Sequence, residues 1–309
     1  MIPPDQEQRA QDHQDIDLST QNRTPRKVSR RRFLKGIFGG LLALPLLSGA
    51  YGRWVEPQWL LRRKLTIVSS TLPQSFRGMR IAHITDIHYG MTIDDDGIRR
   101  IVKEVMAEKP DLICYTGDLV EDGRLRASAI IPLLQQLRAP LGQYAVLGNH
   151  DYERGQDLVT SDLQAAGFEV LTNRSVLLTR GMDRIAIAGI DDVLDGEPDM
   201  IAAMKQIPTD TWCMLLAHEP DWADEAIKAA IDVQLSGHSH GGQVRFPFVG
   251  ALSLPFWGQK YPDGYYRFER ASLTGRPLQL HTSRGIGTTL LPIRFMCPPE
   301  WTLITITDQ

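Results

Sequence analysis

The sequence is poor in cysteine, with only Cys114, Cys213 and Cys297 in 309 residues. So few thiols, with no Cys-x-x-Cys pair, exclude a disulfide framework and a thiolate zinc cluster. Cys114 and Cys213 lie inside apolar runs, where their expected role is that of small buried hydrophobic side chains.

An excess of positive charge is also absent. The formal net charge is -3 and the isoelectric point is near 6.2. Because no basic field is available to bind a phosphate backbone, nucleic acid is not an expected partner. The proportions of 42% hydrophobic and 23% charged residues are those of a globular protein with a large core.

The N-terminal part of the chain has the pattern of a targeting signal. The stretch SRRRFLKG, residues 29–36, resembles the twin-arginine export signal, with Arg30 and Arg31 as the pair. A glycine-rich apolar run over residues 37–50 follows it, as in a signal segment. The alternative is a short buried helix behind a basic flank. We expect residues 1–50 to be a targeting segment.

Export would determine where the protein works. Small residues at 48–50 are suited to cleavage, whereas an uncut segment would leave residues 36–50 as a membrane contact. We expect a linker at 51–60 and one catalytic domain at 61–309. The expected location is the periplasm or the outer face of the cytoplasmic membrane, and the expected partner in delivery is the twin-arginine export machinery.

Beyond residue 60, short apolar runs alternate with amphipathic stretches. Runs such as DLICYT precede predicted helices at 95–109, 126–138, 157–167 and 221–230, and the C-terminal runs read as strands without helices between them. This alternation predicts an α/β protein. We expect a mixed two-sheet β-sandwich flanked by helices.

Polar side chains follow the predicted strands at the point where each strand ends. In an open α/β sheet, ligands bind at the carboxyl ends of the strands, so these separate ends could supply one crevice. The residues concerned are Asp86, His88, Asp118, Asn149, His150, Asp151, His218, His238 and His240.

Their chemistry is that of a metal site. Carboxylates, imidazoles and an amide oxygen form a mixed O/N ligand set suited to Zn, Mn or Fe. The set is larger than one tetrahedral ion needs. Two divalent ions about 3.5 to 4 Å apart, sharing a carboxylate, would use all these ligands and would clamp the oxygens of a phosphoryl displacement.

The ordered blocks D-x-H, G-D, G-N-H-D, H and G-H-x-H resemble the calcineurin-like metallophosphoesterase superfamily. The stretches LAHEPD, SGHSHGGQVR and RGIGTTLLPIRFMCPPEWTLI look like its bacterial, twin-arginine-exported phosphodiesterase branch. The resemblance implies a four-layer α/β/β/α fold. It also implies one metal held by Asp86, His88 and His240, a second held by Asn149, His218 and His238, and a bridge between them from Asp118.

The same resemblance implies a hydrolase in which a hydroxide between the two ions attacks phosphorus in line. It assigns His150 to transition-state stabilisation and protonation of the leaving group. Asp151 could orient His150 by accepting a hydrogen bond from its second ring nitrogen, or could be a simple turn residue.

Three other features could serve either in packing or at the site. We expect His83 to be a core histidine. The glycines after His281 could let a loop bring Arg284 to the site, although packing is an equal alternative. For the aromatic group of Phe246, Phe248, Phe256 and Trp257, core packing is expected ahead of an apolar wall beside the metals.

The predicted function is metal-dependent hydrolysis of a phosphoester, with a phosphodiester favoured because no long insertion interrupts the motifs and closes the site. One alternative is a pyrophosphohydrolase acting on a nucleotide-linked envelope lipid. A second is a metal-loaded envelope protein that binds a phosphorylated ligand without turnover. A positioned acid at His150 argues against pure binding.

Overall fold

The computed structural model describes residues 29–121, 129–269 and 275–308. The chain divides into two units, residues 1–45 and residues 46–309. Helix α1 (Arg30–Trp54) includes residues of both. Within the described ranges, no helix combines the length and the apolar character needed to cross a membrane.

The first sheet of the larger unit has six strands in the order β1-β14-β2-β3-β4-β5. They are β1 (Leu61–Val68), β2 (Met79–Ile84), β3 (Leu112–Thr116), β4 (Gln143–Val146), β5 (Glu169–Val170) and β14 (Glu300–Thr307). Strands β2 to β5 run parallel, and β14 is antiparallel to β2. Every residue of β3 is buried, as expected of a strand covered on both faces.

The second sheet also has six strands, in the order β12-β13-β9-β8-β7-β6. They are β6 (Arg174–Arg180), β7 (Asp183–Gly189), β8 (Trp212–Leu216), β9 (Val233–Ser236), β12 (Gly264–Phe268) and β13 (Leu278–Thr282). The four central strands are parallel and the two edge strands are antiparallel. A separate two-stranded ribbon joins β10 (Arg245–Phe246) to β11 (Gly250–Ala251).

Short helices complete the unit. The α-helices are α2 (Asp95–Ala107), α3 (Ile131–Leu134), α4 (Asn149–Arg154), α5 (Gln156–Ala165), α6 (Met200–Met204) and α7 (Ala223–Ala226). The 3-10 helices are η1 (Glu56–Gln58), η2 (Gln74–Phe76), η4 (Pro220–Trp222) and η5 (His240–Gly242). Helix α2 begins where the Asp94 side chain accepts a hydrogen bond from the backbone N–H of Gly97, and it buries Ile98, Ile101 and Val105 at helical spacing.

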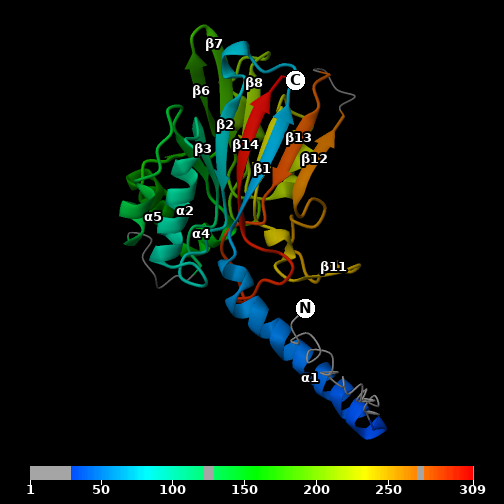
Figure 1. Cartoon of the computed structure of the whole chain (residues 1–309). Helices are drawn as coiled ribbons and strands as arrows, with labels where there is room; N and C mark the ends of the chain where they lie inside the picture. The colour runs from blue at the N-terminus through cyan, green and yellow to red at the C-terminus, as the bar shows by residue number, and fades with distance from the viewer. Residues whose placement is uncertain (1–28, 122–128, 270–274, 309) are drawn as a thin grey trace, which may run out of the picture. The chain divides into compact units, whose positions relative to one another are not determined.

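The predicted two-sheet architecture is confirmed. One apolar core lies between the two sheets, where Met79 and Leu112 of the first sheet meet Ile187 and Met214 of the second. Two further cores bury α2, α3 and α5 against the first sheet, and α6 and α7 against the second. Figure 1 shows α2 and α5 together on one flank of the strands. The layers are therefore α/β/β/α.

Two predicted helices are shorter than expected. Of the helix expected at 126–138, the described part is helical only over α3, and tight i to i+3 turns follow at Gln136 and Leu137. The stretch at 221–230 forms η4 and the four-residue α7. Hydrophobic periodicity marked the buried face in both places but overestimated the length of the helix.

The expected linker at 51–60 is not a free connection. The carboxylate of Glu56 is buried and accepts hydrogen bonds from the backbone N–H groups of Met296 and Cys297. The carbonyl oxygen of Gly52 accepts from the backbone N–H of Arg294 at 2.9 Å. Because a buried carboxylate is stable only with such partners, this segment is tied to the loop that precedes β14.

Candidate metal centre

The site lies where β2, β3, β4, β8 and β9 end. Backbone hydrogen bonds join the turns that follow these strands, including one from Asp86 N–H to the carbonyl of Gly117 at 2.9 Å and one from Gly237 N–H to the carbonyl of His218 at 3.0 Å. The turns therefore bring residues that are far apart in the chain to one edge of the two sheets.

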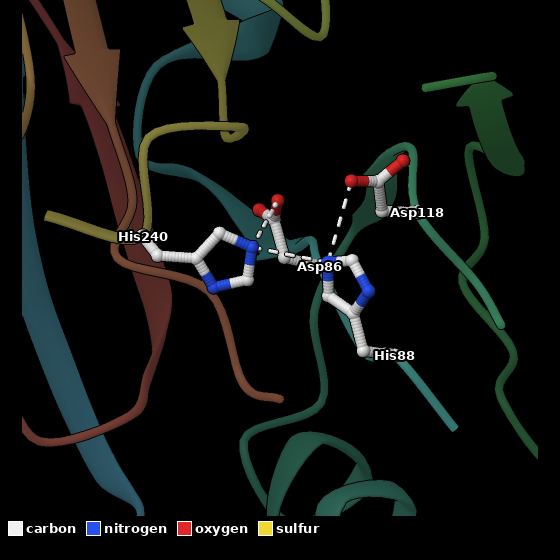
Figure 2. Close-up of side chains that lie close together, drawn as sticks. All are labelled: Asp86, His88, Asp118 and His240. Carbon is white, nitrogen blue, oxygen red and sulfur yellow. Dashed lines mark hydrogen bonds and ion pairs between the residues drawn. The ribbon is translucent and has the colours of Figure 1, made fainter. Parts of the chain in front are cut away.

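Four side chains from these turns point toward one another: Asp86, His88, Asp118 and His240 (Figure 2). Their ligand atoms all lie within 4.8 Å of one another. Nε2 of His88 lies 3.0 Å from Nε2 of His240 and 3.3 Å from Oδ2 of Asp118. Oδ1 of Asp86 lies 3.3 Å from Nε2 of His240.

These separations fit one metal ion. Metal–ligand bonds of about 2.0 to 2.2 Å place neighbouring ligand atoms about 3.0 to 3.4 Å apart, as observed in this quartet. All four residues are buried, and buried carboxylates in contact with imidazole nitrogens need a cation or protons to balance them.

A second group of predicted ligands also approaches Asp118. Oδ2 of Asp118, the oxygen near His88, also lies 3.2 Å from Nε2 of His218. The rings of His218 and His238 have centroids 5.0 Å apart, and Asn149 lines the same cavity as His238. The seven predicted metal ligands are thus brought together around Asp118.

Unsatisfied polar atoms provide an independent test of the fit. Within the described residues, Oδ2 of Asp86, Oδ1 of Asn149 and Nε2 of His218 are buried without a hydrogen-bond partner. Native proteins rarely leave such atoms unpaired unless an ion or water satisfies them. The donor set and these unpaired atoms are suited to a divalent metal.

Three of the histidines have one ring nitrogen engaged by an acceptor outside the cluster. Nδ1 of His88 contacts the Glu121 carboxylate at 2.6 Å, and Nδ1 of His218 contacts the carbonyl of Thr116 at 2.6 Å. Nε2 of His238 contacts the carbonyl of Phe256 at 2.9 Å. These acceptors must receive a proton from the ring, so the other nitrogen of each neutral imidazole keeps its lone pair for a metal.

The backbone is strained at the same place. Five of the seven predicted ligands, Asp86, His88, Asp118, His238 and His240, have φ between 44° and 66°. Side-chain-bearing residues rarely adopt this left-handed conformation, and it persists where the surrounding structure enforces it, often at functional sites. Gly237 allows the close approach, since a Cβ there would lie 2.1 Å from Oγ1 of Thr85.

The carboxylates of the cluster favour positive charge on the groups beside them. Burial alone would lower the pKa of His88, but its hydrogen bonds to Asp118 and Glu121 outweigh this and raise the pKa to about 10. Burial opposes the charge on Asp118, whereas His218 and His88 hold its pKa well below the usual value. The carboxylates thus favour positive charge between them, as a metal cation would supply.

A cavity of about 390 Å³ opens over the cluster. His150 lines it, with Nε2 3.2 Å from Oγ1 of Thr289 and Nδ1 3.6 Å from carboxylate oxygens of Glu121 and Glu153. Its backbone N–H donates to Oδ1 of Asp118 at 3.1 Å. His150 is therefore placed beside the metal ligands with its ring available to a molecule in the cavity.

Of the two roles left open for Asp151, the structure does not support the pairing with His150. The Asp151 carboxylate accepts hydrogen bonds from the backbone N–H groups of Gly148, Asp118 and Leu119 at 2.8 to 3.0 Å. Its side chain is completely buried. Because three amide donors occupy it, Asp151 holds the two metal-site turns together instead of orienting a catalytic ring.

Two residues that the sequence did not single out contact the ligands. Oε2 of Glu121 is hydrogen-bonded to Nδ1 of His88. Its Oε1 accepts hydrogen bonds from the backbone N–H of Leu290 and from the hydroxyl of Thr289. Arg294 is completely buried, donates to the carbonyls of Gly287 and Cys297, and places Nη2 3.4 Å from Nδ1 of His240. No local motif distinguishes Glu121, and Arg294 lies in the stretch RGIGTTLLPIRFMCPPEWTLI, whose resemblance gave this arginine no role.

Replacing Glu121 is expected to weaken metal binding through His88. Glu121→Ala removes the carboxylate that fixes the His88 ring, and loss of such an outer partner costs about 10- to 100-fold in metal affinity. Titration of the metal-free protein against a competing chelator measures this. Glu153→Gln is the matched control, because Glu153 also faces His150 but is exposed and makes no contact with His88. Wild-type affinity in Glu121→Ala would rule out the positioning role.

The structure also places the two other histidines and the arginine named from the sequence. His83 is a buried core histidine bonded to Thr116, as expected. His281 is also buried and is bonded to Thr302. Arg284 does not line the cavity; its guanidinium donates to Asp263 at 2.9 Å.

Core packing is wrong for most of the aromatic group. Phe246, Phe248 and Phe256 are exposed and Trp257 is only partly buried. Phe246 belongs to the separate ribbon strand β10, and the other three belong to loops outside both six-stranded sheets.

Comparisons with known proteins agree with this geometry. The family model described as calcineurin-like phosphoesterase matches residues 79–242. The uncharacterized metallophosphoesterase YkuE of Bacillus subtilis is 36% identical and is aligned over 91% of this chain and 98% of its own length. Phosphodiesterase YaeI of Escherichia coli is 29% identical, over 90% and 99%. The UDP-2,3-diacylglucosamine pyrophosphatase LpxG of Chlamydia muridarum is 26% identical, over 84% and 93%.

Proposed function

Because this chain belongs to the calcineurin-like phosphoesterase family and is thus a metal-dependent phosphoester hydrolase, we propose that it cleaves phosphodiesters at a centre of two divalent ions. The observation that carries the proposal is the position of Asp118. Its Oδ2 lies 3.3 Å from the ligand nitrogen of His88 and 3.2 Å from that of His218. One carboxylate oxygen thus faces two groups of ligands.

In this proposal, Asp86, His88 and His240 hold one ion, and Asn149, His218 and His238 hold the other. Bound divalent ions supply Lewis acidity to a phosphoryl oxygen and lower the pKa of water to generate a nucleophile. Zn, Mn and Fe all suit a ligand set of imidazole, carboxylate and amide groups.

The cavity lining favours a diester over a monoester. Its described polar side chains are Asp118, Asn149, His150, Glu153, His238, Ser239, His240, Gln243, Ser253 and Thr289. None of these is a lysine or an arginine, whereas a phosphate monoester carries a second negative charge that needs a cationic partner. The carboxylate of Glu153 would repel that second charge.

His150 supplies the remaining chemistry. Its ring lies 4.9 Å from the His88 ring, centroid to centroid, and lines the cavity. We assign to it the donation of a proton to the departing ester oxygen, a role that requires hydrogen-bond reach of that oxygen in the bound state.

A pyrophosphohydrolase acting on a lipid-linked substrate is the second candidate. The relative named UDP-2,3-diacylglucosamine pyrophosphatase motivates it, and the apolar side chains of Leu194, Pro255 and Leu290 line the cavity beside the polar ones. These side chains give an acyl or other apolar substituent a surface to contact.

A direct assay separates these possibilities. Metal-free protein, reloaded with Mn, Zn or Fe, is offered bis(p-nitrophenyl) phosphate, p-nitrophenyl phosphate and a pyrophosphate diester. We expect kcat/KM for the diester to exceed that for the monoester by at least about tenfold, the effect of one unpaired charge, and we expect no turnover without metal. Preference for the monoester would contradict the proposal, and preference for the pyrophosphate would favour the second candidate.

A further inference from the structure

An exposed apolar surface adjoins the cavity on one side. The hairpin that contains β10 and β11 exposes Phe248, Val249 and Leu252, and the loop before β14 exposes Leu290, Leu291 and Met296. We call these six side chains the apolar rim. Isolated exposed apolar side chains are ordinary, but a contiguous group marks an interaction surface.

Contacts between the two segments hold the two parts of the rim next to each other. The backbone N–H of Arg245 donates to the carbonyl of Phe295, and that of Phe295 donates to the carbonyl of Gln243, both at 2.9 Å. The rings of Phe246 and Phe295 lie 5.5 Å apart. The hairpin and the loop therefore form one supported structure.

The aromatic side chain at the tip of the hairpin, Phe248, is not buried against the fold. The backbone N–H of Val249 donates to the carbonyl of Phe246, closing a turn with Pro247 in its second position. Phe248, in the third position, has φ of 67° and is completely exposed. Turns of this kind favour glycine or asparagine there, so a bulky exposed ring at this place points to a use outside the fold.

The occupant that fits is a lipid bilayer. Residues 241–261 and 284–299, which supply the rim, contain no aspartate or glutamate, so no carboxylate of these segments repels anionic headgroups. The hairpin part of the rim is closed by backbone hydrogen bonds, including those from Val249 N–H to the carbonyl of Phe246 and from Leu252 N–H to the carbonyl of Val244. Internal bonding of backbone groups favours contact with an apolar phase. Aromatic and aliphatic side chains of this kind bind the boundary between headgroups and acyl chains.

The segment that precedes β1 packs against the loop that carries half of the rim. Tyr51, which directly follows residues 36–50, packs its ring against Phe295 at 6.2 Å. Trp54 and Val55 near it are exposed. The exposed side chains of Trp54 and Val55 therefore add to the apolar surface beside this loop.

We propose that the apolar rim docks on a bilayer and presents the cavity to phosphodiesters borne by lipids. The cavity and the rim share the loop after β13, since Thr289 and Leu290 line the cavity, so docking places a headgroup at its mouth. The substrate class rests on the proposed phosphodiesterase function, but the docking does not.

Bilayer contact is tested with a tryptophan at the tip. Full-length Phe248→Trp is mixed with vesicles of phosphatidylcholine and phosphatidylglycerol whose acyl chains carry bromine, which quenches nearby indoles. We expect the added fluorescence, relative to the parent protein, to fall by about half or more. Met182→Trp is the control, because Met182 is equally exposed but lies in the turn between β6 and β7, at the far end of the β-sandwich from β11 (Figure 1). Equal, weak quenching at both positions would overturn the docking and leave a protein partner as the occupant.

Substrate delivery is tested with Phe248→Ser combined with Val249→Ser. We expect hydrolysis of a vesicle-borne phospholipid with a p-nitrophenyl headgroup to fall about tenfold, since each lost apolar contact weakens docking, and hydrolysis of bis(p-nitrophenyl) phosphate to stay within about twofold. Equal losses on both substrates would contradict the delivery role. Absence of turnover on every substrate would refute the proposed function, whereas the quenching experiment would still decide the docking.

Discussion

Replacing Asp118 with asparagine is expected to remove the metals and the activity together. The Oδ2 atom of Asp118 faces His88 at 3.3 Å and His218 at 3.2 Å, so a single change weakens both halves of the centre. It also removes a negative charge that would offset the repulsion between two cations. We expect metal affinity to fall by more than the roughly 100-fold that marks loss of an outer partner. Elemental analysis of the purified variant measures the resulting loss of bound metal.

A second buried carboxylate controls for loss of folding. Asp232 lies just before β9, at the opposite end of that strand from His238, and its oxygens accept from Thr71 and from the backbone N–H of Cys213. Asp232→Asn should lower the unfolding temperature while keeping the metals. If Asp118→Asn retained two equivalents of metal with normal turnover, the bridging role would be wrong.

Replacing His150 with asparagine is expected to separate catalysis from metal binding. His150 lines the cavity but is not among the proposed ligands, so the variant should keep both metals. Loss of a positioned acid costs about 10²- to 10⁴-fold in turnover. Metal analysis and kcat on the same preparation test both expectations.

The leaving group identifies the role more closely. An ester with an acidic leaving group needs little protonation, so a nitrophenyl diester should suffer least in His150→Asn and an alkyl diester most. Equal losses on both would indicate electrostatic stabilisation of the transition state instead of proton transfer. Full activity on both would exclude a catalytic role for His150.

Much of the centre could be predicted without the structure. The ligands follow directly after strands whose hydrophobic runs are local and easily recognised, as Asp86 follows β2 and Asp118 follows β3. The carboxyl ends of parallel strands share an edge of the sheet, so a correct assignment of strands already implies that these groups meet. The residue types then restrict the chemistry to metals with oxygen and nitrogen ligands.

What supports the ligands could not be predicted in this way. Glu121 contacts His88 from 33 residues away, and Arg294 approaches His240 from 54 residues away. Glu121 belongs to no motif, and the stretch that contains Arg294 gave this residue no role, so only the packing of distant turns reveals these contacts. The same holds for Asp151, whose place next to His150 in the sequence suggested a partnership, while the turn of the chain directs its carboxylate to three backbone amides.

Exposure was the other property that the sequence misjudged. Phe248 and Phe256 are of a residue type that is common in cores, but burial depends on whether a second element covers the side chain. Both residues lie in segments outside the two sheets, where nothing in the described chain covers them. Local pattern therefore determined the strands, the ligand types and the chemistry, because these depend on neighbouring residues. Tertiary structure alone decided which side chains orient the ligands and which apolar residues face outward, because both depend on contacts between segments remote in sequence.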